Sequence, residues 1–453
     1  MKAQAKPVNP NYKWVIAAVC FISILIGLGI CSSSKGQFLD PITKELHLYS
    51  SLFSVTDTIR YATTAVINLF FAALVAKMGA KRMMVYGIAC LAVSMLLYSI
   101  APSLPEEGAT AADYVKTLAP VYGAGFFLGL GLAWSTTTMI GYIVGKWFTK
   151  DRGTVMGVVL AANGLGNALS AQLLNPVIIG RWPVPLFGSV PVRSAYRLVA
   201  VLLAGVIVLL LIFFREPPEG HLDGEFKGKK RRGRQWVGIE WPEIKKKYYF
   251  YVTAVCVFLT GFALQSIAGV SKRHLTNVYG EDFAALIISL YATTLCFTKL
   301  LSGFSYDRIG LRKTMLICNV AASVGIFGMA LAPATMPWLG LTSKIILAFA
   351  MPLETVMLPL IAADMFGEKC FTKVMGLFVS INTAGYAVGS PITNLVYDIT
   401  GSYTPILVVL GGLMSVVAVV EQIDLHHAEK DRETFLAKLE AAEPAPAESK
   451  PEA

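Results

Sequence analysis

Residues 155–166 read VMGVVLAANGLG, and residues 374–385 read VMGLFVSINTAG. Both stretches begin with Val-Met-Gly, and Asn163 in the first has its counterpart in Asn382 at the same internal spacing. Similarity between two distant stretches of one chain predicts a duplicated structural unit. We therefore expect Asn163 and Asn382 to occupy equivalent positions in two halves of the molecule.

A second pair of stretches supports the duplication. Residues 76–82 read AKMGAKR and residues 307–313 read DRIGLRK, and each stretch follows the second apolar run of its half. Two parallel repeats around a central site are the architecture of a secondary transporter. This pattern predicts a fold and leaves the transported compound open.

The sequence around these motifs is strongly apolar. Of the 453 residues, 55% are hydrophobic and 15% are charged, and the mean hydropathy of +0.60 is too high for a soluble globule of this size. About 20 apolar residues in a helix cross a bilayer core, and continuous apolar runs predict helices, not strands. We expect an all-α membrane protein with about twelve transmembrane helices in two pseudo-symmetric six-helix bundles. The expected spans are residues 14–46, 51–75, 82–101, 118–144, 153–175, 194–214, 248–278, 283–306, 314–332, 339–366, 374–396 and 403–420.

The distribution of charge predicts the domain organisation. Residues 215–247 are strongly basic within a chain of formal net charge +10, and basic loops stay in the cytoplasm. These residues should link an N-terminal bundle, 1–214, to a C-terminal bundle, 248–422, with both termini cytoplasmic. Residues 423–453 are expected to be a largely disordered cytoplasmic tail. The long apolar run after Lys13 lacks a small-residue cleavage site, so we interpret it as a membrane helix and not as a signal peptide.

Residues 303–313, GFSYDRIGLRK, resemble the cytoplasmic loop motif of the major facilitator superfamily, and the resemblance covers nearly the whole chain. In that family, the acid and the bases of the motif hold neighbouring helices together in one conformation. The first-half copy has Ala76 in place of the acid, which predicts asymmetric gating. The resemblance implies a gating role for Gly303, Asp307, Arg308, Gly310 and Arg312.

Two further stretches resemble the monocarboxylate and oxalate/formate transporter branch of that superfamily. They are residues 38–46, FLDPITKEL, and residues 129–153, which start with GLG and end with WFTKDRG. That branch holds the substrate carboxylate with a cation in helix 8, four residues before the motif's first glycine. The corresponding residue is Lys299, where arginine is usual. The acid that accompanies this cation in animal monocarboxylate carriers falls at Leu295, and residues 374–396 contain no match for the second cation of oxalate exchangers.

Ionisable residues inside membrane helices are candidates for function, because centring one in lipid costs at least about 2.5 to 3.5 kcal/mol. Lys299 lies seven residues before Tyr306, or about 10 Å from the helix end at 1.5 Å per residue. It either contacts the substrate or forms a structural ion pair. Lys35, near the outer end of the first helix, is either a snorkelling boundary residue or a substrate ligand.

The second and tenth helices carry further charges. Asp57 and Arg60 are spaced to pair on one helix face; alternatively, Arg60 faces a cavity and binds a carboxylate with its fork of donors. Glu354 stands between two prolines, where the helix is expected to kink. Because the usual helix-8 acid is missing, a proton-coupled carrier needs another carboxylate, and Glu354 and Asp57 are the candidates. The alternative for Glu354 is an ion pair with Lys299 or Arg60.

Neutral side chains complete the candidate site. Asn163 and Asn382 either hydrogen-bond a substrate or hold helices together. Trp134 and Tyr386 either form an apolar wall for a short organic acid or simply pack. The cysteines lie singly in apolar runs and are interpreted as packing residues.

Known enzyme signatures are missing from the sequence: it contains neither HExxH nor a Walker loop, and the five histidines form no metal set. We therefore expect a non-enzymatic protein without cofactor or metal, in which an ion or substrate gradient drives transport. The favoured function is secondary transport of small organic anions, mono- or dicarboxylates, by proton symport or anion exchange. The alternatives are an exporter of cationic or amphiphilic compounds and a membrane receptor or scaffold that transports nothing. We expect a monomer in lipid, in a bacterial cytoplasmic membrane, that does not bind nucleic acid.

Overall fold

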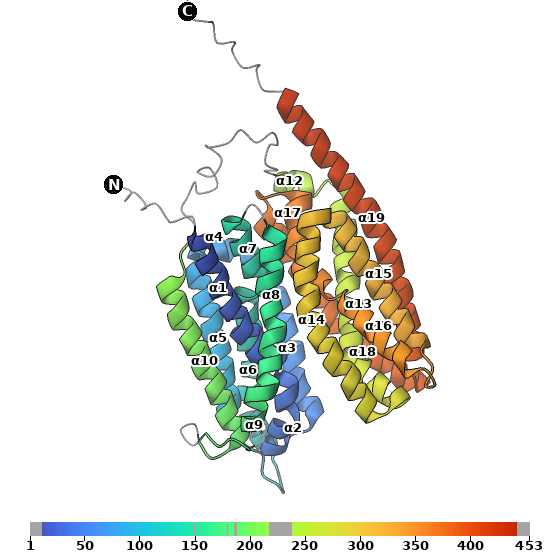
Figure 1. Ribbon diagram of the computed structural model, residues 1–453. Helices are drawn as coiled ribbons and strands as arrows, with labels where there is room; N and C mark the ends of the chain where they lie inside the picture. Colours follow the sequence, from blue (N-terminus) through green and yellow to red (C-terminus); the bar gives the residue numbers. More distant parts are fainter. Residues whose placement is uncertain (1–10, 149–150, 179, 185–187, 217–237, 442–453) are drawn as a thin grey trace, which may run out of the picture.

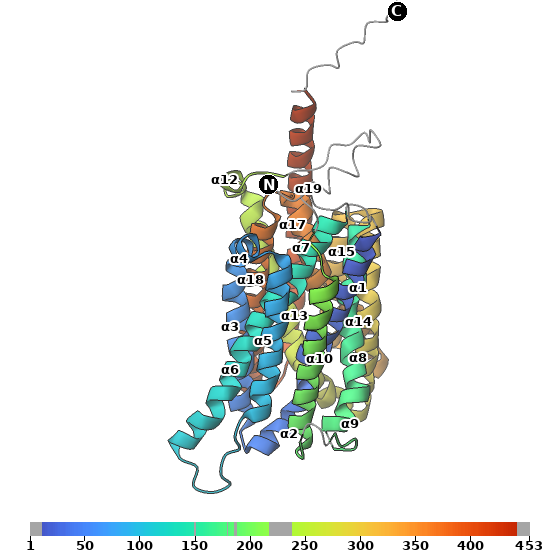
Figure 2. The same cartoon turned by 90° about the vertical axis from the view of Figure 1, so that its left-hand side faces the viewer.

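The computed structural model describes residues 11–148, 151–178, 180–184, 188–216 and 238–441. Within these ranges every regular element is a helix. Figures 1 and 2 show two bundles side by side, one from each half of the chain, with both termini at the same end of the molecule. We call this end the termini side and the opposite end the far side.

The first bundle contains the helices before the basic linker. Several of its spans are built from two or three helical segments that follow one another directly. The segments are α1 (Tyr12–Ile24), η1 (Leu25–Ser33), α2 (Lys35–Leu46), α3 (Ser50–Leu69), α4 (Phe71–Met78), α5 (Ala80–Ile100), α6 (Ala111–Ser135), α7 (Thr137–Trp147), α8 (Arg152–Leu169), η2 (Ser170–Leu174), α9 (Asn175–Ile178) and α10 (Pro191–Phe213).

The second bundle follows a short helix, α12 (Trp241–Ile244), at the end of the linker. Its long helices are continuous, apart from the tenth span, which is divided. The elements are α13 (Tyr248–Tyr279), α14 (Glu281–Ile309), α15 (Leu311–Leu331), α16 (Pro337–Ala348), η4 (Leu353–Met357), α17 (Leu358–Phe366), α18 (Phe371–Thr400) and α19 (Thr404–Ala441).

The number of apolar spans agrees with the expected architecture. In the described part of the chain, 10 helices are long and apolar enough to cross a membrane, or 11 if the bent pair α3 and α4 counts as one span. The remaining long helix, α18, carries the polar residues Asn382, Thr383 and Tyr386, which line the cavity described below. The expected all-α fold of two six-helix halves is confirmed.

Five of the expected helices are interrupted, among them the first, the second and the tenth. The first span changes to a wider π-helical turn at Leu25 and restarts at Lys35. The second bends by 66° between α3 and α4. The tenth opens into the π-helical segment η4 after Pro352, as expected for a proline that cannot donate a backbone hydrogen bond.

The repeated glycines mark equivalent helix crossings in the two bundles. A Cβ atom on Gly166 would lie 2.9 Å from the Cα of Gly29, so α8 crosses the first span backbone to backbone. A Cβ atom on Gly385 would lie 2.5 Å from the carbonyl oxygen of Phe258, so α18 crosses α13 in the same way. Small residues at such crossings allow close helix packing in membranes. The internal repeat in the sequence thus corresponds to a repeated contact.

The last helix continues past its expected end at residue 420. α19 runs as one helix to Ala441 (Figure 1), so the expected tail from residue 423 begins within a helix. Asp424 and Ala428 are buried, because this part of α19 packs on α13 and α15. Residues 442–453, where we expect disorder, lie outside the described residues.

Candidate functional site

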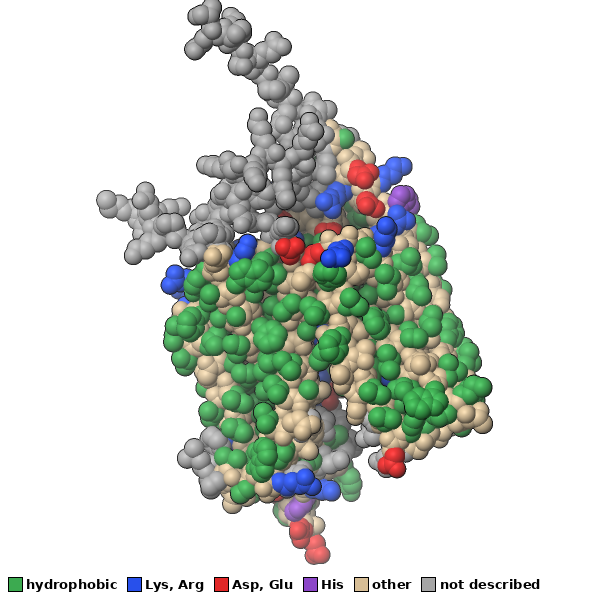
Figure 3. All heavy atoms as spheres, in the orientation of Figure 1, with side chains coloured by type: hydrophobic (Ala, Val, Ile, Leu, Met, Phe, Trp, Pro, Cys, Tyr) green, Lys and Arg blue, Asp and Glu red, His purple; other side chains and the backbone are tan. Residues whose placement is uncertain are grey.

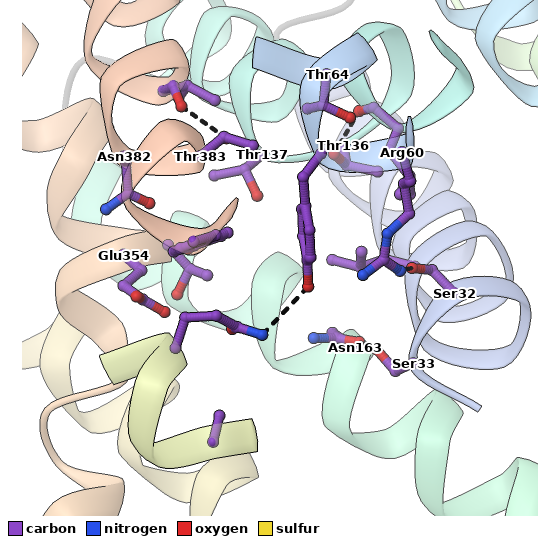
Figure 4. Close-up of a pocket in the computed structure, with 18 of the residues that line it drawn as sticks. Ser32, Ser33, Arg60, Thr64, Thr136, Thr137, Asn163, Glu354, Asn382 and Thr383 are labelled. Carbon is purple, nitrogen blue, oxygen red and sulfur yellow. Dashed lines mark hydrogen bonds between the residues drawn. The ribbon is translucent and has the colours of Figure 1, made fainter. Parts of the chain in front are cut away.

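A cavity of about 590 Å³ lies between the two bundles. Figure 3 shows the molecule hollowed between the bundles on the far side. Figure 4 shows Arg60 and Asn163 on one wall and Glu354 and Asn382 on the other. Most of the residues singled out from the sequence contribute to its lining: Lys35, Asp57, Arg60, Asn163, Lys299, Glu354, Asn382 and Tyr386.

The first bundle contributes a cluster of two cations and one acid. The Asp57 carboxylate lies 2.9 Å from Lys35 Nζ and 3.2 Å from Arg60 Nη2. Arg60 also donates to Ser32 at 3.3 Å, and its guanidinium lies 4.4 Å from the centre of the Tyr61 ring. The expected pairing of Asp57 and Arg60 is present, and both side chains also reach the cavity. The cluster keeps one positive charge in excess.

The second bundle contributes a lysine and a glutamate without ion pairs among the described residues. Lys299, on α14, is 6% exposed, and Glu354, on η4, is 7% exposed. The Glu354 atom Oε1 has no hydrogen-bond donor among the described residues, and the Tyr386 hydroxyl interacts with the same carboxyl group. Buried charges without an ion-pair partner in direct contact are costly, so both side chains are candidates for binding an anion or a proton.

The two asparagines of the repeat both reach the cavity through different contacts. Asn163 Oδ1 accepts a 2.7 Å hydrogen bond from Ser33, and Asn382 Nδ2 donates to the Val257 carbonyl at 3.1 Å. Tyr386 meets Tyr61 edge to face across the bundles, with ring centres 5.8 Å apart. The aromatic pair closes the cavity wall between the halves.

Trp134 is the exception among the candidate residues, since it is not part of the cavity lining. Its Cβ atom lies against Gly87 of α5, within the first bundle, because its face of α6 packs on α5. Of the two interpretations made from the sequence, packing is the one that fits the position of Trp134 in this structure.

Sequence reasoning missed several polar residues of the cavity and one buried cation outside it. Gln265 and Tyr61, which share a 3.2 Å hydrogen bond, line the cavity together with Ser32 and Thr383. A glutamine inside an apolar run is a signal that could have identified Gln265. Lys344 is 1% exposed and lies 4.2 Å above the Tyr291 ring; its position in the tenth span was an equally visible signal.

The termini side of the cavity is closed by contacts between the bundles. Asp307, at the end of α14, accepts hydrogen bonds from the backbone amides of Gly153 at 3.0 Å and Thr154 at 2.6 Å. These amides belong to the first turn of α8, where helices have unsatisfied donors and a positive dipole end. The carboxylate therefore caps a helix of the opposite bundle. Arg152, in the same turn, pairs with Glu368 across the bundles at 3.1 Å.

The other residues of the expected gate have different positions. Gly303 allows close contact, because a Cβ atom there would meet the Gly153 carbonyl. Gly310 has a φ of +82° and forms the turn between α14 and α15, a conformation suited to glycine. Arg308 stacks on Phe304 of its own helix, and Arg312 contacts His426 of α19 at 3.2 Å. Both arginines thus stay within the second bundle.

Among the described residues, the first-half copy of the motif forms no cap between the two bundles. Ala76 replaces the acid, and Glu216, beyond α10, accepts a 3.0 Å hydrogen bond from the Lys81 amide. This contact lies within the first bundle. The two copies of the motif thus make different contacts, and asymmetric gating stays a prediction.

An apolar, duplicated bundle around a polar cavity is the architecture of a membrane transporter. The family model of the Major Facilitator Superfamily matches residues 19–282 and 253–435. The chain belongs to this superfamily, and it is a multi-pass membrane transporter for a small molecule and not an enzyme.

Similar proteins were found among both curated sequences and solved structures. The uncharacterized MFS-type transporter YcxA of Bacillus subtilis (strain 168) is 24% identical over 440 residues, which cover 94% of this chain and 98% of YcxA. Human monocarboxylate transporter 12 is 20% identical over 439 residues, with coverages of 89% and 79%. The resemblance to the monocarboxylate branch is thereby confirmed.

Two solved structures share the fold. The Escherichia coli fucose:proton symporter FucP, as its N162A variant, has a TM-score of 0.67 at 12% identity, covering 91% of this chain and 99% of its own. The proton:xylose symporter XylE, bound to 6-bromo-6-deoxy-D-glucose, has a TM-score of 0.67 at 14% identity, with coverages of 91% and 95%. At these identities the likeness concerns the fold alone.

Proposed function

We propose that this chain carries small organic anions, mono- or dicarboxylates, across the membrane by alternating access. The termini side is the cytoplasmic side, because the basic linker belongs there by the positive-inside rule. With the cytoplasmic side closed and the far side hollowed, the structure then corresponds to an outward-open state. We place the protein, as a monomer, in a bacterial cytoplasmic membrane.

The observation that carries the proposal is the charge of the cavity. Three cations, Lys35, Arg60 and Lys299, and two acids, Asp57 and Glu354, line it. Asp57 is shared by the two cations of the first bundle, so that bundle presents one net positive charge. A cavity with excess positive charge and low exposure favours an anion.

The second bundle suggests how protons enter the cycle. Lys299 and Glu354 both line the cavity and interact electrostatically. When Glu354 is ionised, it compensates the charge of Lys299 and weakens the attraction for a carboxylate. When Glu354 takes up a proton, Lys299 is free to bind the substrate. Proton and anion binding would then favour each other, as symport requires.

The names of the relatives support the substrate class to a limited degree. Monocarboxylate transporters 12 and 13 occur among the similar sequences at 20 to 22% identity. In this chain a lysine, Lys299, holds the helix-8 position at which that branch has a cation. We extend the substrate class to dicarboxylates because Arg60 and Lys299 supply two separate cationic sites.

The test is uptake of labelled lactate, formate, oxalate and succinate into proteoliposomes, with and without an inward proton gradient. Lys299→Gln is the test variant. Lys116→Gln is its matched control, because Lys116 is exposed at the start of α6 and pairs only locally with Asp113. We expect saturable uptake of at least one acid, lost in Lys299→Gln and unchanged in the control.

Two results would contradict the proposal. Wild-type rates in Lys299→Gln would remove this lysine from the site. Absence of uptake for every acid, with binding of a cationic compound instead, would favour an exporter of cationic or amphiphilic compounds. Faster uptake with the inward proton gradient would indicate symport, and uptake that does not depend on the gradient would indicate anion exchange.

A further inference from the structure

A row of titratable residues runs along one face of α19, outside the central cavity. Glu421, Asp424 and His427 follow one another at intervals of three residues, which places them about one helical turn apart on the same face. Glu421 is 4% exposed and Asp424 is 2% exposed, whereas His427 is exposed on the termini side. The row thus leads from the surface into the interior of the second bundle.

The two acids have hydrogen-bond donors but no ion pair among the described residues. Asn319 of α15 donates to Glu421 Oε2 at 2.6 Å, and Thr253 of α13 donates to Asp424 Oδ2 at 2.5 Å. Among the described residues of α13 and α15, the titratable groups that interact with the acids are Tyr248, Tyr249, Cys256 and Cys318; on α19 itself, His427 interacts with Asp424. None of these groups of α13 and α15 supplies a positive charge.

Two oxygen atoms at this site have no donor among the described residues. They are Oδ1 of Asn319 and Oδ1 of Asp424, on side chains that are 0% and 2% exposed. Buried acceptors normally have a partner, and a buried carboxylate without a cation is costly. Both observations indicate a site that takes up a proton.

A second, small cavity lies beside Glu421. It has a volume of about 10 Å³ and is lined by Glu421, Thr260 and Asn382, among others, which is close to the minimum for one water molecule. Asn382 also lines the central cavity. Asn382 is therefore a lining residue of both cavities.

The exposed end of the row is suited to exchange protons with solvent. His427 Nδ1 lies 2.9 Å from the Ile423 carbonyl oxygen. Because a carbonyl only accepts, Nδ1 carries the hydrogen and Nε2 is the acceptor nitrogen of the ring.

We propose that Glu421 and Asp424 form a second proton site, which exchanges with the termini side through His427 and is separated from the central cavity by Asn382. A proton from water binds His427 Nε2, passes to the Asp424 carboxylate and then to Glu421, and each donor returns to its former state. Neighbouring residues of the row are about one helical turn apart, and the proton crosses this distance by rotation of a carboxyl group or through one bridging water. The proposal rests on the proposed function only in taking the central cavity as the transport pathway.

Asn382 determines whether protons can pass from Glu421 into the central cavity. An amide side chain does not titrate, so protons do not pass it while the small cavity stays closed. Movement of α18 during the transport cycle would open the connection. The site would then release or supply the coupled proton on the cytoplasmic side.

The first test does not depend on any substrate. A hydrophobic carbodiimide adds a buried carboxylic acid across one of its C=N bonds to give an O-acylisourea, and transfer of the acyl group from oxygen to nitrogen then leaves a stable N-acylurea. We expect peptide mass spectrometry of the full chain in liposomes to find this modification at Glu421, several-fold more at acidic than at alkaline pH. Glu45, which pairs with Arg193 at 3.0 Å, is the internal control. An unmodified Glu421 at every pH would overturn the proposal.

The second test separates a proton site from a structural role. Glu421→Gln keeps an acceptor for Asn319, so it should fold, and we expect proton-driven uptake to fall about tenfold while exchange of substrate stays within about twofold. Glu421→Asp should restore part of the driven uptake. Equal loss of uptake and exchange, without rescue, would overturn the proposal. If no acid is transported at all, the proposed function fails and the carbodiimide result still decides this site.

Discussion

Removal of the Asp307 charge should open the termini side of the transporter. In the structure this carboxylate accepts hydrogen bonds from the amides of Gly153 and Thr154 at 3.0 and 2.6 Å. Both amides lie in the first turn of a helix from the other bundle. Asp307→Asn keeps one carbonyl acceptor and loses the charge and the second acceptor.

The magnitude follows from these two contacts. A hydrogen bond to a charged group contributes about 1.5 to 3 kcal/mol, and loss of a helix N-cap costs about 0.5 to 2 kcal/mol. Because Asn retains one bond and Asp307 is only partly buried, we expect a loss of about 1.5 kcal/mol. Since 1.4 kcal/mol is a factor of ten, the equilibrium should shift about tenfold toward states with this side open.

Distances between spin labels at Arg82→Cys and Lys313→Cys report this opening. Both positions are exposed on the termini side, at equivalent places of the two bundles. The labels require a background without the seven native cysteines. We expect a longer-distance population to appear in Asp307→Asn. Asp282→Asn, at the far-side end of the same helix, should leave the distances unchanged.

An unchanged distance distribution in Asp307→Asn would refute the reasoning. It would mean that the Arg152–Glu368 pair and the glycine contacts suffice to keep the termini side closed. Equal shifts in Asp307→Asn and Asp282→Asn would also refute it, because they would reflect general destabilisation.

Four further changes test the site and its surroundings. Glu354→Gln should abolish stimulation of uptake by a proton gradient while exchange continues, because the site then behaves as permanently protonated; persistent stimulation would exclude Glu354 as the coupling group. Arg60→Lys keeps the charge but loses the fork of donors, so KM should rise several-fold for dicarboxylates and less for monocarboxylates; equal changes for both would argue against bidentate binding. Gly303→Ala places a methyl group against the Gly153 carbonyl and should cost about 1 to 3 kcal/mol, measured as a lower melting temperature, whereas an unchanged value would mean that the helices separate freely. Asn382→Asp should raise the passive proton flux of substrate-free liposomes, followed with an internal pH dye; a wild-type flux would show that Asn382 is not the barrier.

Some features of the site were recognisable from composition and spacing alone. A charge inside an apolar run is rare, so Lys299, Arg60 and Glu354 stood out as candidates before their surroundings were known. The repeat identified Asn163 and Asn382 as equivalent. Trp134 did not stand out reliably, because an aromatic residue on a membrane helix looks the same in sequence whether it faces a cavity or a neighbouring helix.

The buried acids of α19, in contrast, could not be recognised as candidates from the sequence. Glu421 and Asp424 follow the last apolar run and resemble the start of a solvated tail in sequence. In the structure they lie between α13 and α15, because α19 continues beyond the apolar run and packs along its whole buried face. Position relative to an apolar run does not reveal which face of a helix its flanking residues occupy.

The sequence by itself determined the membrane class, the helical architecture and the duplication, because these depend on the length, continuity and repetition of apolar runs, which are local properties of the chain. Only the tertiary structure decided which charges meet. The cluster of Lys35 with Asp57 and Arg60, the meeting of Lys299 and Glu354 at one cavity, and the capping of α8 by Asp307 each bring together separate segments of the chain. Helix rotation and crossing set these contacts, and both depend on the packing of all the helices together.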